Sequence, residues 1–218
     1  MFCTDRDLLV IEPRLFNEVS LPGQRLADGQ GELSDSVLTP DPTWAGTLGL
    51  IGPGSVVVVA GVPAEVLGPA KDGTALTLSR LRSSIDAPAL PLPDIPSARV
   101  TIDTFAPQIA AAHALLLARI GVLPDEALSL GVTPNPWRPL ESQILRPRAL
   151  WLVEALLAVW IIGRAAAGTE VASPFSVRAR AAHRRALRVL AACQIEIDTD
   201  GDGRADAVLT PGVSHLSV

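Results

Sequence analysis

The sequence predicts an α+β protein, in which a helical domain is interrupted by a small β-barrel-like insertion and followed by a C-terminal β-hairpin. Three observations carry this prediction. Turn formers separate short β-prone runs between residues 21 and 82, apolar residues recur at helical spacing after residue 103, and two short β-prone runs flank an acidic turn. The predicted divisions are an N-terminal helix joining the helical domain (1–20), the insertion (21–82), a connector (83–98), the helical domain (99–193) and the hairpin (194–218).

Composition indicates a folded chain with segregated charge. Hydrophobic residues make up 48% and charged residues 19% of the 218 residues, so we expect a packed core. The net charge of −5 argues against a protein that binds nucleic acid over its whole surface. Residues 1–130 carry a net charge of −7 and residues 138–192 one of +6, so one part of the protein is expected to present a positive field.

The sequence predicts a soluble protein of a reducing cytoplasm, without membrane contact. The N-terminus, MFCTDRDLLV, has acidic residues where a signal peptide needs basic ones. The longest apolar run, Ala149–Ile162, is too short to span a bilayer and contains Glu154. Cys3 and Cys193 match no metal-ligand spacing and are interpreted as free thiols.

The first helix is predicted from its cap. Thr4 can cap it, Asp5 and Asp7 favour the positive end of its dipole, and Pro13 limits it. Beyond Leu21, closely spaced turns suggest a barrel or curled sheet. The β-prone runs between these turns are Ser36–Leu38, Thr47–Ile51, Ser55–Ala60, Ala64–Leu67 and Ala75–Leu81.

Residues 83–98, SSIDAPALPLPDIPSA, predict an extended and stiff proline-rich connector. A helix then begins at Asp103 or Thr104 and ends at Gly121. Its apolar residues recur at spacings of four, three, four and four, which predicts a stripe that faces a core. These residues are Phe105, Ile109, Ala112, Leu116 and Ile120.

Two more helices are expected. The first runs from Pro147 to about Ala166 and is apolar on all sides, so it lies either at the centre of a bundle or between subunits. The second begins at Ser173-Pro174, a good cap followed by proline at the first helical position, and ends near Ala192. Short strands at Gln194–Ile197 and Ala207–Leu209 complete the chain.

The strongest local motif is an acidic loop of the pattern D-x-D-G-D-G-x-x-D between these strands. Alternate carboxylates and two glycines suit Ca²⁺, which accepts six to eight oxygens in loose geometry. The motif lacks the final bidentate Glu of an EF-hand, because Leu209 stands there. A structural calcium ion and a solvated turn without metal are both open interpretations. The candidate ligands are Asp198, Asp200, Asp202, Asp206 and the carbonyl of Arg204.

Arginines concentrate on the last helix, where Arg180, Arg184 and Arg188 form a column at four-residue spacing. They are either a solvated basic face or a surface for a polyanion or an acidic partner subunit. The full candidate set is Arg178, Arg180, Arg184, Arg185 and Arg188. Small residues are expected on the opposite face of the helix, namely Phe175, Ala179, Ala182, Ala186, Leu190 and Cys193.

The sequence offers no nucleophile–base pair, so we expect a protein that is not an enzyme. His113, His183 and His215 belong to no H-E-x-x-H pair and to no G-x-S-x-G elbow. Gly52-Pro53-Gly54 precedes a strand, which argues against a phosphate-binding loop. Glu154 is read as an isolated acidic residue.

Four segments together resemble the small neck proteins of tailed bacteriophages and phage-like elements, the head–tail adaptor or head-completion proteins. They are TDRDLLVIEPRLF (4–16), the strand run VVVVAGVPAEVLGP with GTALTLSRLR (56–82), TFAPQIAAAHALLLARIGV (104–122), and the last helix followed by IDTDGDGRADAV (197–208).

The resemblance implies a structural virion protein that assembles in the bacterial cytoplasm. It would form a ring, by family resemblance of twelve copies, between the portal protein and the tail or tail-completion proteins. Such a ring lines the DNA channel, contacts the DNA non-specifically and serves as a platform for tail attachment. A calcium-stabilised binding module of non-viral origin is the alternative.

Overall fold

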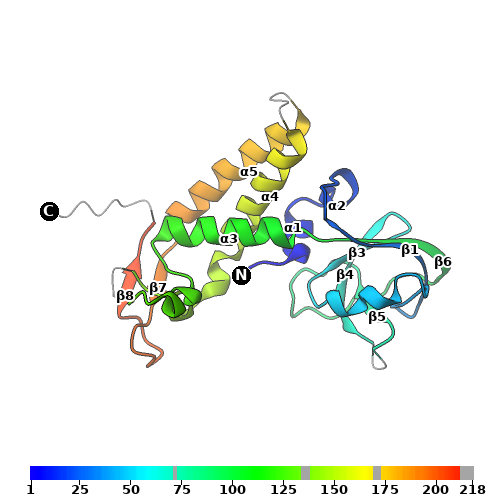
Figure 1. Cartoon of the computed structure of the whole chain (residues 1–218), viewed down its shortest axis with the longest axis horizontal. Coiled ribbons are helices and arrows are strands. Elements are labelled where there is room, and N and C mark those ends of the chain that lie inside the picture. The colour runs from blue at the N-terminus through cyan, green and yellow to red at the C-terminus, as the bar shows by residue number, and fades with distance from the viewer. Residues whose placement is uncertain (71–72, 134–137, 169–172, 212–218) are drawn as a thin grey trace. The chain divides into compact units, whose positions relative to one another are not determined.

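The computed structural model describes residues 1–70, 73–133, 138–168 and 173–211. The chain divides into two compact units, which are Thr4–Ala106 and Met1–Cys3 together with Pro107–Val218. The first holds a closed β-barrel, and the second holds helices and a C-terminal hairpin (Figure 1). The predicted mixture of a barrel, several helices and a C-terminal hairpin is therefore confirmed.

The elements of the barrel unit are α1 (Asp5–Ile11), α2 (Leu15–Glu18), β1 (Arg25–Ser34), β2 (Val37–Pro40), the 3₁₀ helix η1 (Ala45–Leu50), β3 (Val56–Val59), β4 (Val62–Pro69), β5 (Leu76–Ser79) and β6 (Ile95–Asp103). Those of the helical unit are α3 (Ala106–Ile120, starting at the boundary), the 3₁₀ helices η2 (Asp125–Leu130), η3 (Glu141–Gln143) and η4 (Pro147–Leu150), then α4 (Trp151–Ala167), α5 (Pro174–Ala191), β7 (Ile195–Ile197) and β8 (Ala207–Leu209).

Six antiparallel strands close the barrel in the order β1-β2-β5-β4-β3-β6, and β6 pairs with β1. Closure leaves no unpaired sheet edge, and inward-facing side chains fill the interior. These buried side chains include Leu33, Leu38, Val57, Leu76, Leu78, Val100 and Ile102.

The N-terminal helix was expected to join the helical domain, and this expectation is wrong, because α1 and α2 belong to the barrel unit. The reason is a buried ion pair network that the sequence does not reveal. Glu65 of β4 is fully buried and accepts hydrogen bonds from the guanidinium groups of Arg6 and Arg82. The Arg6 amide also donates to the Gly54 carbonyl at 2.8 Å. A buried carboxylate needs such partners, and Arg6 fixes α1 on the barrel by supplying one.

Strand β1 was not predicted, since its Asp28-Gly29 pair was read as a turn. Gly29 instead lies within the strand, where it pairs with Val100 of β6, and the indole of Trp44 packs against it. A Cβ at residue 29 would lie 2.4 Å from Trp44 Cδ1, so only glycine fits there. The run Thr47–Ile51, predicted as a strand, lies largely in the 3₁₀ helix η1.

The boundary of the connector also differs from the prediction. Residues 95–103 form β6, whereas the sequence assigned residues up to 98 to a connector and the following ones to the helical domain. Ala98, Val100 and Ile102 alternate toward the barrel interior. This period of two is the signal that the abundance of proline concealed.

The three longer helices agree with their predicted positions, and Ser173 caps α5 by accepting the Ser176 amide hydrogen at 3.1 Å. Helices α4 and α5 lie side by side (Figure 1). They approach closely where Gly163 faces Ala179, because a Cβ on Gly163 would lie 3.0 Å from the Ala179 Cβ. As predicted, Ala179, Ala182, Ala186 and Leu190 form a buried face of α5.

The apolar helix is longer than the run Ala149–Ile162, which was expected to be too short to span a bilayer. The 21 residues Pro147–Ala167 form the one helix, within the described ranges, that is long and apolar enough to cross a membrane. Of its most apolar window, 56% is buried within the protein. Glu154, in the first turn of α4, is fully buried among protein partners described below.

Candidate functional site

The acidic loop forms as predicted between β7 and β8, which pair in register from Ile195 opposite Leu209 to Ile197 opposite Ala207. Gly201 and Gly203 adopt left-handed backbone angles, with φ of 80° and 82°, which residues with a side chain rarely adopt. The loop therefore requires the glycines that the motif contains.

Three of the four predicted aspartate ligands come together in this loop. Asp198, Asp200 and Asp206 each offer an oxygen, and these oxygens lie within 4.8 Å of one another, so the cluster could hold a metal ion. Asp202 lies outside this group and accepts the Arg204 amide hydrogen with Oδ1 at 2.8 Å. The two residues are thus joined to each other by a turn of the loop.

The loop also satisfies several of its own carboxylates. Asp198 accepts the amide hydrogens of Gly201 at 2.7 Å and Gly203 at 2.8 Å. These hydrogen bonds lower the pKa of the Asp198 carboxyl, and the bond from Gly203 has the largest effect. Asp206 accepts from the hydroxyl and the amide of Thr199, which lower its pKa likewise. Both carboxyls are ionised near neutral pH, and the loop holds its shape by hydrogen bonds that need no cation.

The arginine helix α5 presents an exposed cationic surface, which we call the arginine face. It consists of Arg180, Arg184, Arg185 and Arg188, which are all exposed. In the part of the chain that the structure describes, none of these four forms an ion pair. The fifth predicted residue, Arg178, is half-buried and lies 5.9 Å from the ring centroid of Phe175. The arginine face is thus available to a partner outside the chain.

At the C-terminal end of this face the surface is hollowed. Arg185 and Arg188 border an open depression of about 600 Å³, and the other lining residues are Val189, Ala192 and Cys193. The depression has a cationic rim and a largely apolar floor.

A cluster around Glu154 was missed by sequence reasoning. The carboxylate of Glu154, fully buried on α4, accepts the amide hydrogens of Phe2 at 3.0 Å and Cys3 at 3.4 Å. Its Oε2 lies 3.1 Å from His113 Nδ1, and His113 Nε2 lies 3.0 Å from Glu141. A buried charged residue within an apolar helix requires partners, and an acidic residue inside the apolar run was the signal that could have revealed the cluster. Its geometry fastens residues 1–3 to the helical unit.

His183 stacks on Trp160 with ring centroids 4.4 Å apart, and burial, with Arg119 as the lesser cause, lowers its pKa. His215 lies outside the described residues.

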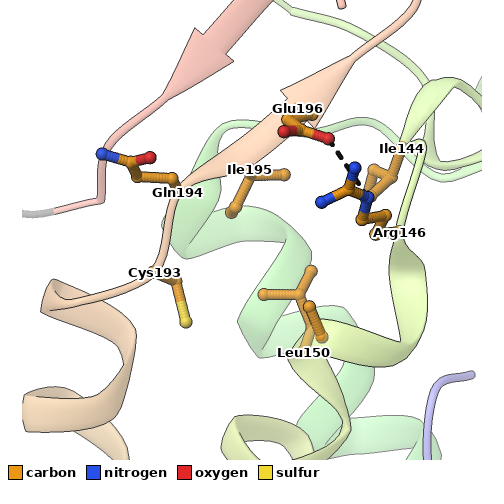
Figure 2. A pocket seen from close by; sticks show the side chains of 8 residues that line it. Ile144, Arg146, Leu150, Cys193, Gln194, Ile195 and Glu196 are labelled. Atoms are coloured by element: carbon orange, nitrogen blue, oxygen red, sulfur yellow. Dashed lines mark ion pairs between the residues drawn. The ribbon is translucent and has the colours of Figure 1, made fainter.

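A second hollow lies beside the end of α5. Figure 2 shows Cys193, Leu150 and Ile195 around it, with the ion pair between Arg146 and Glu196, 3.4 Å long, at one side. Its volume of about 250 Å³ is below the roughly 300–1,000 Å³ of small-molecule sites. Burial raises the pKa of the Cys193 thiol, so the thiol is not activated as a nucleophile.

Comparisons of the chain with models of protein families, with curated proteins and with solved structures found no match.

Proposed function

We propose that this chain is a structural protein of the neck of a tailed bacteriophage or phage-like element. It forms a homo-oligomeric ring, of twelve copies by family resemblance, between the portal protein and the tail. The ring lines the DNA channel, serves as the platform for tail attachment, and joins the virion after assembly in the host cytoplasm. The proposal includes no catalytic step and no membrane contact.

The arginine face carries this proposal. Exposed arginines at four-residue spacing on one helix repel one another, and each such pair destabilises the helix by roughly 0.2–0.5 kcal/mol. No carboxylate among the described residues compensates for this repulsion. An acidic partner protein or the phosphates of passing DNA would do so, and a neck protein meets both.

The buried charges support a structural role. Glu65 is held by Arg6 and Arg82, and Glu154 is held by His113 and two backbone amides. These arrangements fix elements of the fold in place. The Cys3 thiol also donates to Glu154 at 3.5 Å, and both groups are buried away from solvent.

Mass photometry of the purified chain, alone and mixed with the portal protein of the same phage, tests the proposal. We expect a discrete high-mass species, which negative-stain electron microscopy should show as a closed ring. A chain that stays monomeric and does not bind the portal would overturn the proposal.

A calcium-stabilised binding module is the second candidate, which the grouping of Asp198, Asp200 and Asp206 favours. Here Ca²⁺ would staple the hairpin as a structural ion. Ca²⁺ at a hundredfold excess over its Kd would then stabilise the protein by about 2.7 kcal/mol. EDTA should lower the melting temperature and abolish ligand binding, and Asp200→Ala should reproduce both effects. If EDTA changes neither, this candidate is lost.

A further inference from the structure

The arginine face has a shape as well as a charge. Arg180, Arg184 and Arg188 extend along two turns of α5, or about 12 Å at the 1.5 Å rise of an α-helix. The depression beside Arg185 and Arg188 adds a concave and largely apolar floor. A phosphate backbone would engage the cations and leave this floor unused. A protruding protein loop with acidic side chains would engage both.

The acidic loop is such a protrusion. Residues 199–206 are all exposed, and the loop from Asp198 to Asp206 carries four aspartates and one arginine, a net charge of −3. Oδ1 of Asp200 accepts the Asp202 amide hydrogen at 3.1 Å, and Oδ1 of Asp202 accepts the Arg204 amide hydrogen at 2.8 Å. Within the described ranges, none of the four aspartates pairs with a cation.

The two surfaces therefore complement each other in charge, and both lie in the helical unit of every copy. Each copy has a cationic hollow without an anion and an anionic loop without a cation. The two do not pair within one chain, so a second copy can satisfy both.

We propose that the acidic loop of one copy docks on the arginine face of a second copy. This inference rests on the proposed ring assembly and names the contact that holds it together. The contact joins two different surfaces, head to tail, and such a contact generates a ring when its rotation closes. Ca²⁺ bound in the loop would neutralise part of its charge and weaken the contact.

A charge swap tests the contact. One variant carries Arg184→Glu with Arg188→Glu, and the other carries Asp200→Lys with Asp202→Lys. Each variant alone brings like charges together, so its self-association, measured by sedimentation velocity in EDTA, should weaken at least about tenfold. An equimolar mixture should regain association, because each arginine face then meets a loop of opposite charge. The chain with all four substitutions should regain it too.

Arg14→Glu with Arg148→Glu is the matched control. These arginines are exposed and belong to neither surface, and the substitutions change the net charge by the same amount as Arg184→Glu with Arg188→Glu. The control should associate like the wild type, and circular dichroism should show that every variant is folded.

Other outcomes separate the two proposals. If the wild type associates and neither reversal weakens it, the docking contact is overturned while the ring assembly stands. If the arginine variant loses only the retention of duplex DNA, the face is a nucleic-acid surface and the docking contact is overturned. If the wild type neither associates with itself nor binds the portal, both proposals fall. If it binds the portal but no two copies contact each other, the docking contact alone is overturned.

Discussion

Replacing Glu154 by glutamine should destabilise the helical unit more than any other conservative change at its carboxylates. The Glu154 side chain is fully buried and serves four donors, the amides of Phe2 and Cys3, the Cys3 thiol and the ring of His113. A hydrogen bond to a charged group contributes roughly 1.5–3 kcal/mol. Glutamine keeps one acceptor oxygen but places an NH₂ group against the remaining donors. We therefore expect a loss of about 3 kcal/mol in the free energy of unfolding.

Urea unfolding followed by far-UV circular dichroism measures this loss, since the helices dominate that signal. Glu141→Gln is the control, because Glu141 is partly exposed and makes two contacts, one of 3.0 Å with His113 and an exposed one of 3.5 Å with the amino group of Met1. We expect a loss of about 1 kcal/mol for the control. If Glu154→Gln costs no more than Glu141→Gln, Glu154 does not anchor residues 1–3, and the reasoning is refuted.

Three further predictions concern single residues. Gly29→Ala should cost roughly 1–3 kcal/mol by forcing Trp44 aside, whereas Gly46→Ala, with open space around it, should be nearly neutral in the same thermal unfolding experiment. Burial raises the pKa of Asp5 from 3.8 to about 6, so the folded state binds the proton more tightly than the unfolded state does. The contribution of Asp5 to the free energy of unfolding therefore falls as the pH rises from about 4 to about 6. The free energy of unfolding of Asp5→Asn, relative to that of the wild type, should therefore rise by about 1.4 kcal/mol per pH unit between about pH 4 and 6 and then level off. Urea unfolding of both proteins at several pH values measures this difference. A difference that stays constant with pH would contradict the prediction. Ser173→Ala should cost about 1 kcal/mol by removing the cap of α5, and loss of helical signal on mild heating measures it.

Elements with a strong local signal were predicted well. The caps, apolar spacing and proline positions of α3, α4 and α5 located these helices, and the glycines of the acidic motif located the hairpin turn. These signals are local, because a cap, a stripe or a left-handed glycine depends on residues within one or two turns of itself. The sequence likewise predicts which residues form the acidic loop and the arginine face.

Elements that depend on distant partners were missed. Strand β1 looks like a turn until Trp44 is known to pack on Gly29, and β6 looks like a connector until its pairing with β1 and β3 is known. Glu154 looked isolated because His113 lies 41 positions away and Phe2 lies 152 positions away.

The sequence by itself determined the hydrophobic core material, the positions of the long helices, the acidic loop and the concentration of arginine on α5. Only the tertiary structure decided that the N-terminal helix belongs to the barrel, that three aspartates converge, and that the arginines have no carboxylate partner among the described residues. The physical reason is the range of the interactions. Helix caps and turns are satisfied by neighbours along the chain, whereas buried charges and close-packed glycines are satisfied by neighbours in space.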